Sequence, residues 1–113
     1  MATQTNNPGK TILASATLPA YRLITAAGAL CGADATADIV GVTQAPAVSG
    51  NYVETRFLSA GSCKLTASGA ISANALVYKA ASGKIGTTNT NRLVGIALEA
   101  ATADGDIIEV MPV

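Results

Sequence analysis

The second half of this 113-residue chain repeats the residue pattern of its first half. Ile39-Val40-Gly41-Val42 returns 54 residues later as Leu93-Val94-Gly95-Ile96. The segment from Gly50 to Glu54 returns 55 residues later as Gly105 to Glu109. Self-similarity with a period of this size indicates one supersecondary unit used twice. The sequence therefore predicts a fold of two similar halves.

The repeat also predicts how the chain is divided. Either half alone is close to the lower size limit for independent folding, so we expect one β domain over residues 11–113 with tandem quasi-repeats at about 11–60 and 61–113. Residues 1–10 lie outside the repeat and contain the turn-prone run Asn6-Asn7-Pro8-Gly9. They are predicted to form a flexible N-terminal arm.

Short runs of β-branched and aliphatic residues make up most of the chain, and turn-forming residues interrupt them at intervals of about eight to twelve positions. This spacing is typical of an all-β fold, here a small barrel or sandwich of short antiparallel strands. The predicted strands are Thr11 to Ser15, Tyr21 to Thr25, Ala29 to Cys31, Ile39 to Gln44, Tyr52 to Leu58, Ser62 to Ala67, Leu76 to Lys79, Lys84 to Thr87, Arg92 to Glu99 and Asp106 to Met111.

Two segments carry clear hairpin signals. Ala81-Ser82-Gly83-Lys84 and Ala103-Asp104-Gly105-Asp106 each place a glycine between predicted strands, where the turn requires positive φ. The helical alternative is Leu98 to Ala103, whose alanines and leucine favour a helix. Because glycines bound that segment, we expect at most one short helical segment.

The apolar material of the chain is mostly small. Apolar residues make up 50% of the sequence, but about one residue in five is alanine, with one phenylalanine and no tryptophan. An alanine removes much less apolar area from water than a leucine does. The predicted core is therefore thin, and we expect the protein to complete its burial against other subunits or a larger surface.

Charge and hydropathy exclude several classes of partner. Seven basic and seven acidic residues cancel, so no net field attracts phosphates or anionic lipids, and nucleic-acid binding is not expected. Glycines interrupt every apolar run before it reaches the length of a membrane span. The first ten residues are polar and lack the apolar segment of a signal peptide. We expect synthesis in the cytosol.

The sequence offers little for catalysis. Histidine is absent, which removes the usual base for a serine nucleophile and the usual zinc ligands. The four lysines are predicted to lie on the solvated surface: Lys10, Lys64, Lys79 and Lys84. We therefore predict no catalytic residue, no cofactor and no enzymatic activity.

Two further groups of residues are candidates for a metal site or a disulfide. Asp104 and Asp106 could join Asp34 or Asp38 around a hard cation, but a hairpin turn explains the first pair fully, so no metal site is predicted. The remaining group is the two cysteines, Cys31 and Cys63. Buried free thiols are favoured for them, with a disulfide as the alternative.

Four segments of the second half resemble the small capsid decoration, or cement, proteins of tailed bacteriophages. These segments are Asn74 to Tyr78, Ala81 to Ile85, Leu93 to Ala101 and Asp104 to Val110. The resemblance implies a structural virion protein, made in the host cytoplasm, that binds the outer surface of a phage head. It also implies that the protein stabilises the lattice of the major capsid protein and acts as a homo-oligomer, a trimer or a dimer on the capsid.

The polar arm is the candidate contact with the capsid. A polar extension outside the repeat can become ordered on a partner by adding a strand to an exposed sheet edge. The predicted capsid-contact residues are Thr3, Thr5, Asn6, Asn7, Pro8 and Lys10.

The alternative function is a receptor- or glycan-binding β module of a viral fibre or spike. Sugar sites need exposed aromatic faces beside polar groups, and the candidates for such faces are Tyr21, Tyr52 and Tyr78. Loss of a glycan signal in Tyr78→Ala would favour this alternative.

Overall fold

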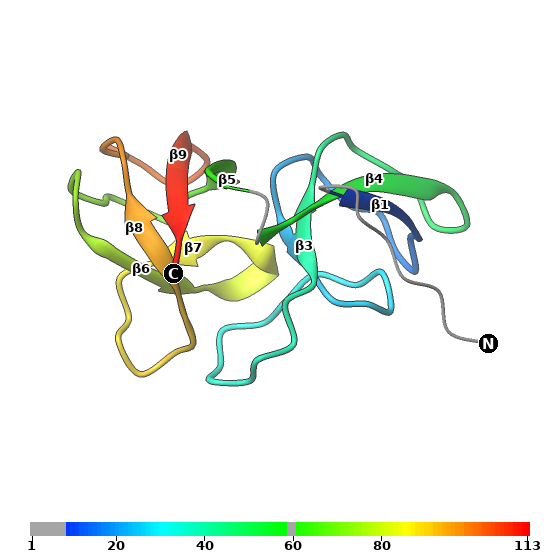
Figure 1. Ribbon diagram of the computed structural model, residues 1–113, viewed down its shortest axis with the longest axis horizontal. Coiled ribbons are helices and arrows are strands. Elements are labelled where there is room, and N and C mark those ends of the chain that lie inside the picture. The colour runs from blue at the N-terminus through cyan, green and yellow to red at the C-terminus, as the bar shows by residue number, and fades with distance from the viewer. Residues whose placement is uncertain (1–8, 59–60) are drawn as a thin grey trace.

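The computed structural model describes residues 9–58 and 61–113 and shows an all-β protein, as the sequence predicts (Figure 1). It is elongated, with principal extents of 42 × 26 × 22 Å. The described strands are β1 (Gly9–Leu13), β2 (Leu23–Ile24), β3 (Gly41–Thr43), β4 (Tyr52–Phe57), β5 (Cys63–Thr66), β6 (Leu76–Lys79), β7 (Ile85–Gly86), β8 (Leu93–Ala97) and β9 (Ile107–Pro112).

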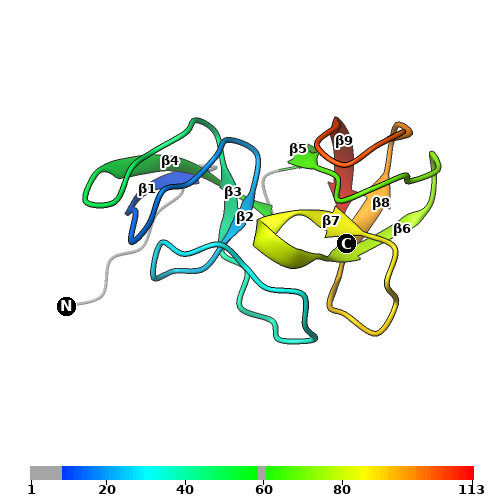
Figure 2. The ribbon, with the colours of Figure 1, turned by 180° about the vertical axis from the view of Figure 1, so that it is seen from behind.

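The strands form two antiparallel sheets that lie side by side along the long axis (Figures 1 and 2). The N-terminal sheet has the order β1-β4-β3-β2, and the C-terminal sheet has the order β5-β9-β8-β6-β7. A parallel bridge joins Ala67, just after β5, to Ile85 in β7. This bridge brings together the two edges of the C-terminal sheet, which therefore curls into a half-barrel.

Most predicted strands are present, and one is absent. Ala29 to Cys31 does not form a strand, because only the isolated bridge between Ile24 and Leu30 pairs it before the chain leaves the sheet. Leu98 to Ala103 is not helical, since Ala101 bridges to Ile71 instead. A short 3-10 segment, η2 (Ala81–Gly83), forms at one predicted turn.

The two sheets share a hydrogen-bonding frame. Gly50 donates its N–H to the carbonyl of Ala14 at 2.9 Å in the first half, and Gly105 donates to Ala67 at 2.9 Å in the second. Both glycines have positive φ, 90° and 96°, which glycine adopts without steric cost. The strand order also agrees when β1, β4, β3 and β2 are matched to β5, β9, β8 and β6. The quasi-repeat stays a prediction, and this correspondence supports it.

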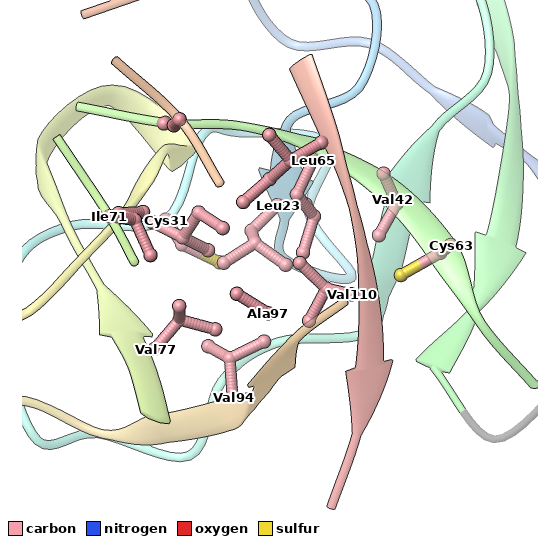
Figure 3. Close-up of a cluster of buried hydrophobic side chains, with 14 residues drawn as sticks. Leu23, Cys31, Val42, Cys63, Leu65, Ile71, Val77, Val94, Ala97 and Val110 are labelled. Carbon is pink, nitrogen blue, oxygen red and sulfur yellow. The ribbon is translucent and has the colours of Figure 1, made fainter. Parts of the chain in front are cut away.

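The core is divided unequally between the halves. A small cluster lies within the N-terminal half and comprises Ile12, Ala14, Leu18, Ile24 and Val53. A larger cluster fills the half-barrel and also contains Leu23, Cys31 and Val42 from the first half (Figure 3). Because the halves share this cluster, we retain one domain over residues 11–113 as a proposal.

The N-terminal boundary of the domain differs from the expected one. Gly9 and Lys10, assigned by sequence to the arm, form the start of β1 and pair with Arg56 and Thr55. The remainder of the predicted arm, residues 1–8, lies outside the described residues. Within the described part of the chain, no helix is long and apolar enough to cross a membrane.

Candidate functional site

Only one predicted capsid-contact residue lies in the described part of the chain. Lys10 is exposed on β1, whereas Thr3, Thr5, Asn6, Asn7 and Pro8 all fall within residues 1–8, outside the described residues. β1 is at the end of its sheet, so one side of this strand carries backbone groups that are not paired within the sheet. Such an edge is a template for pairing with another chain.

The start of β1 leads to a cleft between the two sheets. Gly9 lines a small hollow together with Gln44, Glu54, Thr55 and Arg56. Gln44 and Arg56 also line a larger open cleft of about 440 Å³. The other residues around this cleft are Tyr21, Ser62, Cys63, Lys64, Glu99 and Glu109.

The cleft has charges of both signs, and several of them are held in place. Ser62 Oγ donates a hydrogen bond to Glu109 Oε2 at 2.7 Å. The backbone N–H of Glu109 donates to Glu99 Oε1 at 2.8 Å. Lys64 Nζ lies 5.8 Å from the centroid of the Tyr21 ring, within the range of a cation–π contact. A wall of fixed donors, acceptors and one aromatic ring suits a polar ligand such as a peptide segment or a saccharide.

Tyr21 has a strained backbone, which the sequence did not signal. Its φ is 58°, a left-handed value that a bulky residue rarely adopts and that costs of order 1 kcal/mol or more. Hydrogen bonds from both halves hold it there: Tyr21 donates its N–H to the carbonyl of Thr43 at 2.7 Å, and its own carbonyl accepts from Thr66 N and Oγ1, both at 3.0 Å. The corresponding residue of the second half, Asn74, has a φ of 67°, which asparagine tolerates better.

The cysteines are free and buried, so the prediction of unpaired thiols is confirmed. Burial raises the pKa of Cys63 to about 11, an effect that nearby Arg56 opposes and Glu109 reinforces. Burial, followed by the charge of Asp38, also raises the pKa of Cys31 to about 11. Both thiols are therefore protonated near neutral pH and are poor nucleophiles.

The prediction that Lys79 lies on the solvated surface is wrong. Its side chain is 0% exposed, and Nζ donates to Asp34 Oδ1 at 2.7 Å, Asp38 Oδ1 at 2.6 Å and the carbonyl of Thr36 at 2.9 Å. Burial alone would lower the pKa of Lys79, but the hydrogen bonds to the two carboxylates outweigh it and raise that pKa. The cluster is an ion pair between the halves, because Lys79 ends β6 and its partners lie in the loop before β3.

The acidic residues weighed as cation ligands are engaged elsewhere. Asp104 pairs with Lys84 at 2.7 Å. Asp106 Oδ2 accepts from Thr102 N, Thr102 Oγ1 and Ala103 N, which lowers the pKa of Asp106 and fixes the turn. Within residues 9–58 and 61–113, no three His, Cys, Asp or Glu side chains are grouped so as to hold a metal ion.

A family model described as phage cement protein matches residues 4–112. The chain belongs to this family. Membership confirms the resemblance found in the second half and extends it to almost the whole sequence. The family description is that of a structural protein of a bacteriophage. No curated protein matches the chain.

Among solved structures, the cement protein is similar to the N-terminal base of the head fibre protein gp8.5 of bacteriophage phi29. The TM-score is 0.76 and the identity is 17%, with 93% of this chain and 92% of the other covered. At this identity the likeness shows the fold alone. The same all-β fold is therefore found in a protein of a phage head fibre.

Proposed function

We propose that this cement protein binds the outer surface of a phage head and stabilises the lattice of the major capsid protein. The observation that carries this proposal is the family match over residues 4–112. The open edge of β1 supports it, because Gly9 at the start of this strand lines the hollow beside the cleft and the exposed Lys10 follows it. The protein is made in the host cytoplasm, carries out no reaction and acts as a homo-oligomer, a trimer or a dimer on the capsid.

The proposed mechanism is thermodynamic. A protein that binds the assembled lattice but not the separated subunits shifts the equilibrium toward the intact shell. One occupied site contributes about 2.7 kcal/mol when the free protein is at a hundred times its dissociation constant. Many copies around the shell add their contributions, so modest affinity at each site is sufficient.

Co-sedimentation tests the proposal directly. The purified protein is mixed with emptied phage heads and, as the control, with separated capsid subunits. We expect enrichment on the heads and little binding to the subunits. Equal recovery in the two samples, or no enrichment on the heads, would refute lattice-specific binding.

Two variants test the contact residues. Deletion of residues 2–8 leaves β1 intact from Gly9 onward, and Lys10→Ala removes the exposed charge on that strand. We expect each variant to bind heads more weakly than Lys84→Ala, a matched change at a lysine in the other half. If the deletion variant occupies heads as fully as the wild type, the arm is not a capsid contact.

A saccharide ligand remains the second candidate, because the cleft places one aromatic ring beside polar groups. Of the three candidate tyrosines, Tyr21 lines this cleft, whereas Tyr52 is 70% exposed on β4 and Tyr78 is half-buried on β6. The measurement is a glycan array with the wild type and Tyr21→Ala. A signal that requires Tyr21, together with no enrichment on heads, would favour the glycan-binding function.

A further inference from the structure

The outward side of the C-terminal sheet carries a group of exposed aliphatic side chains. Pairing aligns Leu76 of β6 with Ile96 of β8, and Ile96 with Met111 of β9, in one row across three strands. Leu76 is 47% exposed and Met111 is 43% exposed. We call this group, together with the half-buried Ile96 in the same row, the outer apolar face. Its exposed members are Leu76, Leu93, Leu98, Met111 and Val113.

The same row exists in the N-terminal sheet, but there it is covered. Leu23 of β2 pairs with Val42 of β3, and Val42 pairs with Arg56 of β4. These three positions correspond, in this order, to Leu76, Ile96 and Met111. Leu23 and Val42 are 0% exposed, because they pack into the cluster that fills the half-barrel (Figure 3). The C-terminal half is thus the cover of the outward side of the N-terminal sheet.

Two more apolar positions are partly buried in the first half, whereas their counterparts in the second half are exposed. Ile39 and Leu58 pack against the half-barrel cluster and are partly buried. Their counterparts 54 and 55 residues later are Leu93 and Val113, which are 38% and 69% exposed. At these matched positions, therefore, the first half keeps an apolar side chain against a β module, whereas the second half exposes Leu76, Leu93 and Val113 to solvent and leaves Ile96 half-buried.

We infer that a second copy of this chain covers the outer apolar face. The chain itself shows which kind of surface suits this face, because the matched face of the N-terminal sheet packs against a β module of the same frame. The chain has no net charge to oppose self-association. Apolar patches of about 300–600 Å² are the largest on typical monomers and often mark interfaces. A polar rim of Lys64 and Glu109 flanks the face, as expected at an interface.

Sedimentation of the full chain without heads tests this inference apart from the capsid role. Over a range of micromolar concentrations, we expect the wild type to associate and Met111→Glu to raise the dissociation constant at least about tenfold, because a carboxylate would be buried without a partner. Val113→Glu should act in the same direction. The Val113 side chain is 69% exposed and its backbone N–H bonds to the Val94 carbonyl, so this variant decides the test if Met111→Glu fails to fold.

Tyr52→Glu is the matched control, since it adds the same charge at a 70% exposed residue of the N-terminal sheet. It should associate as the wild type does. A wild type that stays monomeric, or foldable face variants that weaken association no more than the control, would overturn the inference. If the wild type is monomeric and Val113→Glu loses head binding, the outer apolar face contacts the capsid protein instead, and the inference is overturned.

Discussion

The two sheets share a strand order and a pattern of turn hydrogen bonds, but β2 and the matching strand β6 differ in length. In the pairing registers, Leu23 of β2 and Leu76 of β6 occupy equivalent positions. The turns after these strands contain equivalent hydrogen bonds, from Thr25 N to Ala29 O and from Ala80 N to Lys84 O, so Thr25 corresponds to Ala80. β6 therefore holds two more residues than β2, at the point where its pairing shifts between Val77 and Tyr78. At this shift the pairing passes over Val94 of β8, and such bulges commonly re-aim a side chain.

The extra residues change what the second half can do. They bring Lys79 to the end of β6, where it reaches Asp34 and Asp38 in the first half. The first half has aliphatic Ile24 at the end of β2, inside its own small cluster. Val77, the counterpart of Ile24, stays buried in the core, so the two extra residues of β6 add the ionic link beyond the core position that both halves share.

The largest expected effect tests the part of the frame that both sheets share. A Cβ at Gly41 would collide with the carbonyl oxygen of Arg56, and a Cβ at Gly95 would collide with that of Met111. We expect Gly41→Ala and Gly95→Ala each to lower the free energy of unfolding by about 3 kcal/mol, since the strands must separate to admit the methyl group. Urea denaturation measures both. If one variant is as stable as the wild type, the two close contacts are not equivalent.

The next effect tests the difference between the sheets. Lys79→Met keeps most of the side-chain volume but removes the ammonium between two carboxylates. We expect a loss of about 2 kcal/mol, below the usual cost of breaking a buried pair because Asp34 and Asp38 keep access to solvent. Denaturant unfolding with Lys84→Met as the control checks this value, since that exposed pair should contribute less than about 1 kcal/mol. Equal losses in the two variants would contradict a special role for Lys79.

The pH dependence of unfolding sharpens the same contrast. The Lys79 hydrogen bond, followed by the Thr36 N–H, lowers the pKa of Asp34 below 3.8, so its contribution is present above that value and is lost as the pH falls through the folded-state pKa. The pKa of Lys79 is raised above 10.5, so its contribution is lost as the pH rises through the folded-state value. Thermal melting should show both losses, and the alkaline loss from this cluster should vanish in Lys79→Met. An unchanged alkaline loss in this variant would place its origin elsewhere.

The smallest effect concerns the matched left-handed residues. Tyr21→Asn gives the first half the residue that the second half has at Asn74. Because asparagine adopts positive φ more readily, we expect stability to rise by about 0.5 kcal/mol, net of the lost ring contact with Lys64. The midpoint of thermal unfolding is the measurement. A clear fall in this midpoint would mean that the ring contributes more than the strain costs.

Much of the strand pattern could be predicted because its causes are local. Alternating aliphatic residues set the strands, and the glycines before Asp106 and Lys84 set the turns, through steric rules that act within a few residues. The strand predicted at Ala29 to Cys31 is absent, because local alternation does not say where the next segment must go. That segment leaves the sheet to bring Asp34 to Lys79, a residue 45 positions away.

By itself, the sequence predicted an all-β fold, a quasi-repeat of two halves, free thiols in preference to a disulfide, and a resemblance to phage cement proteins, because these follow from local steric preferences, composition and motif. Only the tertiary structure decided that Lys79 is buried, that Tyr21 is strained beside a cleft and that one of two matched sheet faces is covered. Each of these depends on which distant segments meet. Pairwise contact across the chain has no counterpart in a local residue pattern, so the asymmetry between two similar halves became visible only in three dimensions.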